Sequence, residues 1–384
     1  MPSLPSFIEL TPSGPFCRPG GFYVDPWRPV EKAVITHAHS DHATRGCGTY
    51  LASTTCGPLL RARLGSDISL TTLRFGEQLA VGDVLVSLHP AGHVLGSAQI
   101  RIEYRGEVIV FSGDYKLDAD PTAERFEPVK CHTFISESTF GLPIFQWQHP
   151  VEVFARINDW WRGNQRDGRT SVLFVYSLGK AQRVLASLDP SIGPIGVHGS
   201  VHNMNKAYVE AGVGLPASVH ANEITAKELR GAGMILTPQT AGESPWLRRF
   251  AGPDGLSLGN VSGWMQVRGA RRRQALDRGF PVSDHADWAG LNAAIAATGA
   301  QRIGVTHGST EVMTRWLREK GVDAFVVPTR YVGETGEASE PDEATAPSGD
   351  APAKEPGAAF DDTGEPLTNQ SDDAVSETRA GGES

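Results

Sequence analysis

Cysteine is scarce in this chain of 384 residues: there are four, and no two of them form a C-x-x-C pair. So few unpaired thiols exclude a disulfide scaffold and favour a reduced, cytoplasmic setting. No apolar run approaches the roughly 18 residues that a membrane span needs, so we expect no membrane contact. The first residues lack a basic stretch followed by an apolar one, so we expect no secretory leader.

The chain also lacks an internal repeat of 20–50 residues and the composition of a coiled coil or of collagen. Its composition is globular, with 40% hydrophobic residues, and its 43 glycines and 26 prolines indicate many turns. The length fits two packed domains or one large elaborated domain.

Negative charge is concentrated at the C-terminal end. Residues 334–384 contain 14 acidic and two basic residues, a net charge of -12. The whole chain has 35 basic and 44 acidic residues, so residues 1–333 keep 33 basic against 30 acidic, a net charge of +3. The tail has too few apolar residues to offset the entropy of ordering, and we expect it to be disordered. It is interpreted as a solubilising tail, or as an acidic decoy that competes with nucleic acid for the basic body.

Short segments rich in Val, Ile, Phe and Thr alternate with segments of helical periodicity, which predicts an α/β fold with layered sheets. Strands are expected over residues 33–36, 84–88, 99–104, 108–111, 133–136, 171–176, 234–237, 302–306 and 324–327. Helices are expected over residues 151–162, 180–188, 287–297 and 311–320. Asp284 is a candidate cap for the third of these helices.

The strongest chemical signal follows the first of these strands, where His37, His39, Asp41 and His42 lie within six residues. Neutral imidazole and carboxylate groups are ligands for zinc and similar divalent ions. A structural zinc site usually contains cysteine, so this segment favours a hydrolytic site that holds water.

Three further polar residues stand where an apolar strand ends: His93 in Ala-Gly-His, Asp114 in Ser-Gly-Asp-Tyr, and His307 in Val-Thr-His-Gly. Side chains at the ends of neighbouring strands are the usual way in which a sheet builds a site. Each residue alone has an ordinary structural explanation, but together with the histidine-rich segment they predict one metal centre.

These motifs resemble those of the metallo-β-lactamase superfamily, whose fold is an αββα sandwich with a two-metal site. The resemblance implies that His37, His39 and His93 bind the first metal ion, and that Asp41, His42 and His307 bind the second. It implies that Asp114 bridges the two ions, and that Asp25 orients a ligand. Two divalent ions are expected, zinc in the first place and manganese as the alternative.

Two more motifs resemble those of the β-CASP nucleases within that superfamily. Glu137 stands in Ser-Glu-Ser-Thr-Phe-Gly, and His285 stands in Ser-Asp-His-Ala-Asp. The whole pattern resembles the bacterial ligase-associated DNA exonucleases, which implies DNA as substrate and an ATP-dependent DNA ligase and a helicase as possible partners. The implied domains are a core of residues 1–142 and 264–333, a β-CASP-like insertion of residues 143–263, and the tail 334–384. The insertion is short for this branch, and the tail is not part of the family pattern.

Hydrolysis of a phosphodiester needs a held water and a proton donor for the leaving oxygen. Asp41 and Asp114 are expected to hold the water, and His285, held by Glu137, is expected to be the general acid. A neighbouring carboxylate favours the protonated form of a histidine.

Positive charge is expected to bind the substrate. Ser177, Lys180 and Arg183 lie at a strand-to-helix junction that suits a phosphate. Arginines are concentrated before the His285 motif and suit a phosphate backbone; they are Arg268, Arg271, Arg272, Arg273 and Arg278. Trp264 and Phe280 flank this patch. They are interpreted as core residues, with base stacking as the alternative.

A DNA exonuclease acting in repair, with 5′ to 3′ polarity implied by the resemblance alone, is the leading hypothesis. The alternatives are a β-CASP ribonuclease of the mRNA 3′-end processing type, a lactonase or thioesterase, and a non-catalytic scaffold that accompanies a ligase.

Overall fold

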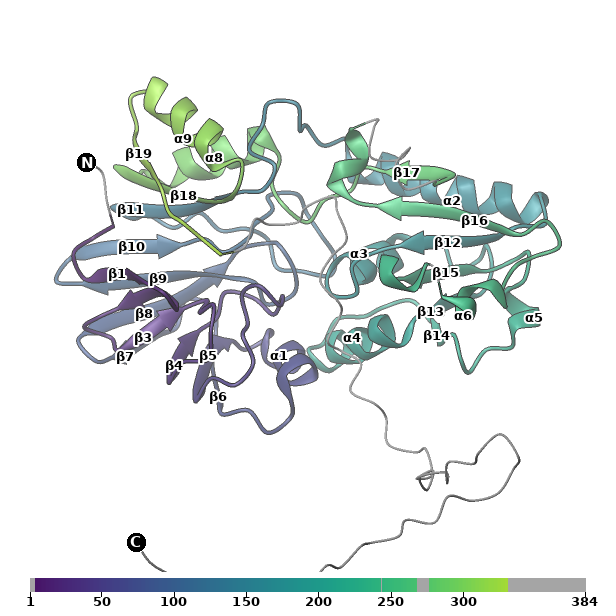
Figure 1. Cartoon of the computed structure of the whole chain (residues 1–384), viewed down its shortest axis with the longest axis horizontal. Coiled ribbons are helices and arrows are strands. Elements are labelled where there is room, and N and C mark those ends of the chain that lie inside the picture. The colour runs from purple at the N-terminus through teal and green to yellow at the C-terminus, as the bar shows by residue number, and fades with distance from the viewer. Residues whose placement is uncertain (1–3, 243, 268–275, 331–384) are drawn as a thin grey trace, which may run out of the picture. The chain divides into compact units, whose positions relative to one another are not determined.

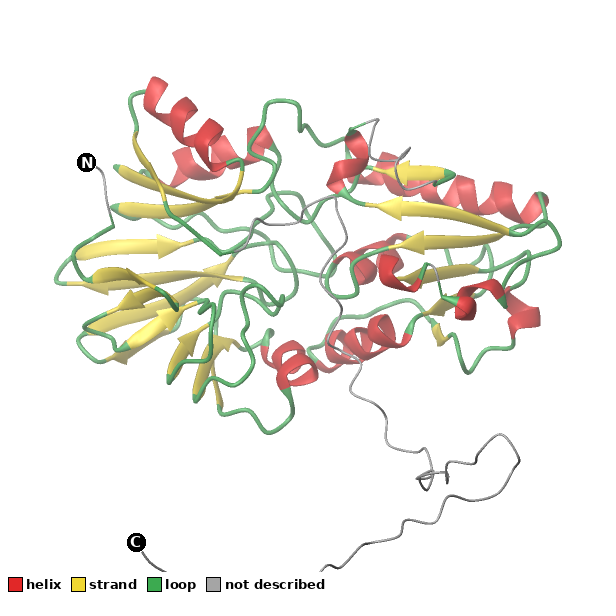
Figure 2. Ribbon diagram, viewed as in Figure 1, coloured by secondary structure: helices red, strands yellow, loops and turns green. Residues whose placement is uncertain are grey.

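The computed structural model describes residues 4–242, 244–267 and 276–330, all within a compact unit of residues 1–344. The predicted arginines 268 and 271–273 and the acidic tail lie outside the described residues. The strands form three sheets, with helices packed on them (Figures 1 and 2). Of the helices that the structure describes, none combines the length and the apolar composition that crossing a bilayer requires.

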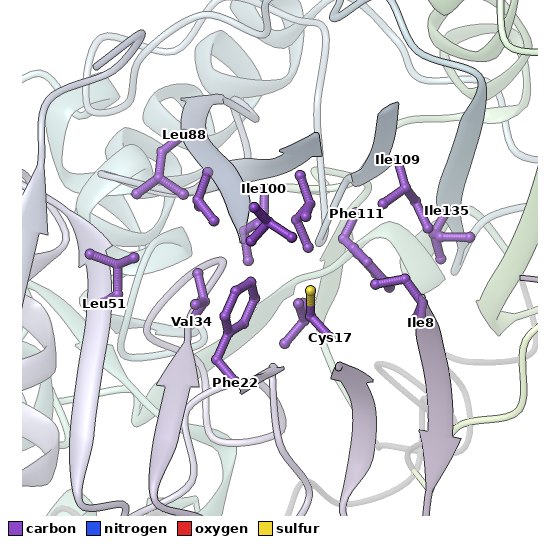
Figure 3. Packing of buried hydrophobic residues seen from close by; sticks show 14 of the residues in the cluster. Ile8, Cys17, Phe22, Val34, Leu51, Leu88, Ile100, Ile109, Phe111 and Ile135 are labelled. Carbon is purple, nitrogen blue, oxygen red and sulfur yellow. The ribbon is translucent and has the colours of Figure 1, made fainter. Parts of the chain in front are cut away.

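The first two sheets face each other. The first sheet contains, in spatial order, β1 (Ile8–Thr11), β2 (Gly14–Cys17), β3 (Phe22–Val24), β4 (Lys32–Val34), β5 (Thr49–Ser53) and β6 (Leu70–Leu73). The second contains β19 (Asp323–Val326), β18 (Arg302–Gly308), β11 (Thr133–Ser138), β10 (Glu107–Phe111), β9 (Ala98–Tyr104), β8 (Val84–Pro90) and β7 (Gln78–Val81). Figure 3 shows side chains of both sheets, such as Phe22 and Ile100, pointing into one shared core.

Alternation along the strands makes this pair of sheets a sandwich covered by helices on both sides. On β10, Ile109 and Phe111 point into the shared core, whereas Val108 and Val110 point to the opposite face. That outer face is covered by α8 (Trp288–Thr298) and α9 (Thr310–Glu319), which lie over β11 and β18 in Figure 1. The outer face of the first sheet is covered by α1 (Gly57–Leu64) and α4 (Gly199–Glu210). The layers are therefore helix, sheet, sheet and helix.

The third sheet is built from parallel strands only. Its order is β14 (Val219–His220), β13 (Ile195–Val197), β15 (Met234–Thr237), β12 (Thr170–Phe174), β16 (Leu256–Val261) and β17 (Arg278–Phe280). One face packs against α2 (Pro150–Arg166) and α3 (Lys180–Ser187), and the other against the short helices α5 (Ala226–Leu229) and α6 (Pro245–Arg248). Coverage on both faces explains why every residue of the central strands β12, β13 and β15 is buried. β17 lies beyond residue 263, the expected end of the insertion.

All nine strands and four helices expected from the sequence are present within a few residues of the expected bounds. The predicted cap of α8 is wrong: Asp287, not Asp284, occupies the N-cap, where its side chain accepts from the backbone N–H of Gly290 at 2.8 Å. Trp264 lies half-buried in a 3₁₀ turn, η2 (Gly263–Gln266), and packs on Phe140 and Phe145. Phe280 is buried, in agreement with its interpretation as a core residue.

Candidate metal centre

The predicted ligands come together because they follow strands that end at one edge of the sandwich. β4 leads into the segment 37–42, β8 into His93, and β10 into Asp114. β10, β11 and β18 are parallel neighbours, so Asp114, Glu137 and His307 emerge at the same edge of the second sheet. This is the edge at which a sheet of this kind gathers functional side chains.

The first candidate group contains His37, His39, His93 and Asp114, all buried. The Nδ1 atom of His39 lies 3.1 Å from Nε2 of His37 and 3.1 Å from Nε2 of His93. Asp114 Oδ2 lies 3.7 Å from Nε2 of His37 and 3.9 Å from Nε2 of His93. Three imidazole nitrogens and one carboxylate oxygen therefore face one point.

Backbone carbonyls fix which nitrogen of two of these rings carries the proton. His39 Nε2 lies 3.0 Å from the carbonyl oxygen of Leu178, and His93 Nδ1 lies 2.8 Å from that of Asp284. A carbonyl only accepts, so each of these outer nitrogens donates a hydrogen. The inner nitrogens of His39 and His93 are then lone pairs that face each other, an arrangement that a cation between them explains.

The third ring is oriented through a hydroxyl. Thr36 Oγ1 donates to Asp25 Oδ2 at 2.6 Å, so its lone pairs accept from His37 Nδ1 at 3.1 Å. Burial lowers the pKa of His37 and of His93 well below the usual value, and the neighbouring imidazoles lower it further. Both rings are therefore neutral at pH 7, which is the form that binds a metal ion.

The second candidate group contains Asp41, His42 and His307. His42 donates from Nδ1 to Asp25 Oδ2 at 2.8 Å, and its Nε2 lies 3.6 Å from Asp41 Oδ2 and 3.4 Å from Asp114 Oδ2. Burial lowers the pKa of His42, but Asp114, Asp41 and Asp25 outweigh it and raise that pKa well above the usual value. The three carboxylates therefore create a negative potential at His42 that stabilises a positive charge there.

Two buried polar atoms at the site have no hydrogen-bond partner among the described residues and would be satisfied by an ion. Within the described part of the chain, His42 Nε2 and Asp114 Oδ1 are buried without a hydrogen-bond partner. Buried polar atoms of this kind are costly unless a ligand or ion satisfies them. Nitrogen and carboxylate donors without a thiolate suit zinc or manganese, so the residues present fit divalent cations at both groups.

His285 and Glu137 form a pair beside these groups. His285 Nδ1 lies 2.9 Å from Glu137 Oε2, and Glu137 Oε1 accepts from the backbone N–H of Tyr115 at 2.7 Å. The His285 ring is 3% exposed, and its centroid lies 4.6 Å from that of His93. Trp147 Nε1 donates to the carbonyl of His285 at 2.9 Å, which fixes the backbone there.

The expected phosphate-binding residues lie at the predicted strand-to-helix junction, between β12 and the first turn of α3, but they are buried. Lys180 and Arg183 are each 2% exposed, and their cationic groups face buried aspartates instead of a surface groove. Ser177 is 6% exposed, and its hydroxyl is 2.8 Å from that of Ser200. The sequence did not predict that Asp284 is a buried partner of Lys116, Lys180 and Arg183. These three basic residues, in the segments that follow Asp114 and Ser177, were the available signal for a buried acidic partner.

A pocket opens beside the second group. Asp41, His42 and His307 form one part of its wall, and much of the remainder is apolar and includes Trp27 and Phe111. His307 holds a positive φ of 52°, one of three such values at non-glycine residues in the described chain. This backbone conformation is sparsely populated and is typical of functional sites.

Comparison with known proteins found relatives by sequence and by structure. No family model matches the chain. A "Probable DNA ligase" of Opitutus terrae is 34% identical over 335 residues, which is 86% of this chain and 32% of that protein. "Endoribonuclease YSH1" of Yarrowia lipolytica is 30% identical over 42% of this chain and 23% of its own length. "Cleavage and polyadenylation specificity factor 73" of Drosophila melanogaster is 32% identical over 31% of this chain and 18% of its own length.

The chain belongs to the β-CASP branch of the metallo-β-lactamase superfamily. It spans about a third or less of the length of each of these relatives. A crystal structure of a protein of unknown function from Enterococcus faecalis shares the fold, with a TM-score of 0.51 at 12% identity over 78% of this chain and 79% of the other. The αβ architecture predicted from the sequence is thus in agreement with these relatives.

Proposed function

We propose that this β-CASP chain is a metal-dependent DNA exonuclease. The observation that carries the proposal is the position of Asp114, which faces the first candidate group through His37 and His93 and the second through His42. One carboxylate shared by two nitrogen-rich groups is the arrangement that two neighbouring cations require. Zinc is the proposed ion and manganese the alternative.

Two such ions, when bound, neutralise the non-bridging oxygens of a phosphodiester and lower the pKa of a bound water toward neutrality. The chain's own residues then have separate tasks. Asp41 and Asp114 accept hydrogen bonds and orient the attacking water. Burial raises the pKa of Asp114, but the neighbouring His42 and His285 outweigh it and hold that pKa well below the usual value, so this carboxylate is anionic.

His285 is assigned as the general acid. Its Nδ1 is bound to Glu137, so the proton passed to the leaving oxygen comes from Nε2. Glu137 is itself held by Tyr115, which keeps the pair in one orientation. A His285→Gln variant is expected to bind metal as the wild type does and to lose 10²–10⁴-fold in turnover, the range typical for a general acid.

DNA is the proposed substrate because a relative that matches 86% of this chain is named "Probable DNA ligase". A ligase and a helicase are proposed partners in DNA repair, and cleavage is proposed to run from the 5′ end. RNA is the second candidate, because other relatives are named endoribonucleases.

The test is turnover on end-labelled DNA and RNA strands of one sequence, with the 5′ and 3′ ends blocked in turn. We expect stepwise loss of DNA from the 5′ end, abolished in Asp114→Asn and retained in the distant variant Asn164→Ala. Preferential cleavage of RNA would replace DNA with RNA as the substrate. If neither strand is cut while metal is bound, the nuclease proposal fails.

A further inference from the structure

Five charged side chains lie buried together behind the candidate metal centre: Lys116, Asp120, Lys180, Arg183 and Asp284. We name them the buried ion cluster. They come from three places in the chain, namely the loop after β10, the helix α3 on the third sheet, and the loop before α8. None of them is used in the chemistry proposed above.

The charges in this cluster are paired at short range. Lys116 Nζ lies 2.6 Å from Asp120 Oδ2, and Arg183 Nε lies 3.4 Å from the same oxygen. Asp284 Oδ1 lies 3.2 Å from Arg183 Nη1, and its Oδ2 lies 3.7 Å from Lys180 Nζ. Burial raises the pKa of Asp284, but Lys180, Lys116 and Arg183 outweigh it, so the pKa is lowered and the carboxylate is ionised.

The same side chains also hold the backbone that orients His93. Arg183 Nη1 donates to the carbonyl of Ser283 at 2.6 Å, and Lys116 Nζ donates to the carbonyl of His93 at 3.4 Å. Between these two points the carbonyl of Asp284 accepts from His93 Nδ1 at 2.8 Å. The cluster therefore fixes both partners of the hydrogen bond that aims this ring at the first candidate group.

A second contact leads from the same element to the centre. The carbonyl of Leu178, two residues before α3, accepts from His39 Nε2 at 3.0 Å. Two of the three imidazoles in the first group are thus oriented from the start of α3. His39 is held directly by Leu178, and His93 is held through Arg183 and the loop at 283–284. Helix α3 packs on the third sheet, so that sheet supports the metal centre without supplying a ligand.

We propose that the buried ion cluster is a positioning device through which α3 sets the affinity of the first group for its metal ion. Buried ion pairs add little net stability, because desolvation offsets the attraction between the charges. Their use here is to fix one geometry of two loops and a helix. Lys180 and Arg183 are then positioning residues instead of contacts to a nucleic-acid backbone. The inference depends on the proposed metal centre, but not on whether DNA or RNA is the substrate.

The experiment is a cobalt(II) titration of the apo-protein, followed by visible absorption, which reports ligand geometry and affinity without any substrate. Arg183→Met removes the bonds to Ser283 and Asp284, and Asp284→Asn removes the charge but keeps the carbonyl that His93 uses. We expect both variants to bind cobalt at least about tenfold more weakly, as is typical when groups that orient metal ligands are removed. Circular dichroism establishes that each variant is folded, and if Arg183→Met does not fold, Asp284→Asn decides.

The matched control is Asn164→Ala. Asn164 is also buried beside the third sheet, where it donates to Ser171 at 2.8 Å, but it lies on α2, away from the cluster. It should lose stability and keep wild-type cobalt affinity. If the cluster variants bind cobalt as tightly as wild type, or if Asn164→Ala weakens binding equally, the proposal is overturned. Wild type that binds no cobalt would overturn the metal centre as well, whereas wild type that binds cobalt but cuts no nucleic acid would overturn only the nuclease proposal.

Discussion

Gly179 packs directly against the segment that carries His93, and replacing it by alanine gives a sharp test of that contact. Gly179 occupies the N-cap of α3 with a φ of 94°. A Cβ there would lie 2.3 Å from Cγ1 of Val94, the residue after His93. Val94 is 1% exposed, and its branched side chain has little rotamer freedom, so the methyl group cannot swing away.

Two costs add in Gly179→Ala. An alanine at this positive φ is strained by roughly 1–3 kcal/mol. Overpacking against Val94 adds about 1–3 kcal/mol. Gly212 provides a matched control, because it has a φ of 93° and nothing within 4 Å of its added Cβ. Gly212→Ala should therefore carry the strain alone, and the two variants should differ by about 1–3 kcal/mol in the free energy of unfolding.

Equilibrium urea unfolding measures both variants, and cobalt titration shows whether displacement of Val94 reaches His93. We expect Gly179→Ala to be the less stable variant and the weaker cobalt binder, and Gly212→Ala to bind cobalt as wild type does. Equal stability of the two variants would refute the argument, since it would mean that Val94 yields without cost.

Three further predictions concern charge, thiols and metal. Burial raises the pKa of Asp120, but the positive charges of Lys116 and Arg183 outweigh burial, so the pKa is lowered in the folded protein. The charge of Asp120 therefore stabilises the fold above the unfolded pKa of about 4. Asp120→Asn should cost about 3–5 kcal/mol at pH 7, and urea unfolding should show that difference shrinking as the pH falls below about 4; a difference independent of pH would contradict the pairing. Burial raises the pKa of Cys17 to about 11, so Ellman's reagent at pH 8 should leave this thiol unmodified in the folded protein and modify it in urea, whereas fast labelling of native Cys17 would argue against its position in the core. Removal of metal by a chelator should lower the melting temperature, because facing lone pairs and paired carboxylates then lose their cation; an unchanged melting curve would argue against bound metal.

Local pattern was enough to predict the parts of this fold that have long apolar strands. β8 to β11 and β18 were recognisable because each has three or more apolar or β-branched residues and is followed by polar ones. The short strands β1 to β3, β13 and β14 were not predicted, since a segment of two to four residues is too short to show a clear period. α4 was also missed, although it covers the first sheet.

The candidate site was predictable for a similar reason. His37, His39, His93, Asp114 and His307 each stand directly after a strand or at its end, so the order of the chain already indicates where they meet. The hydrogen bonds that orient His39 and His93 were not predictable, because their partners Leu178 and Asp284 lie more than a hundred residues away in the sequence. Such contacts depend on how the third sheet packs against the sandwich, and a single sequence does not reveal that packing.

The most direct test of the two-metal centre is an anomalous difference map from crystals of the full chain grown with zinc, recorded at the zinc absorption edge. We expect two peaks, one among His37, His39 and His93 and the other among Asp41, His42 and His307, with Asp114 facing both. A map with no peak at these residues, or with a peak at the first group alone at full zinc occupancy, would contradict a two-metal centre.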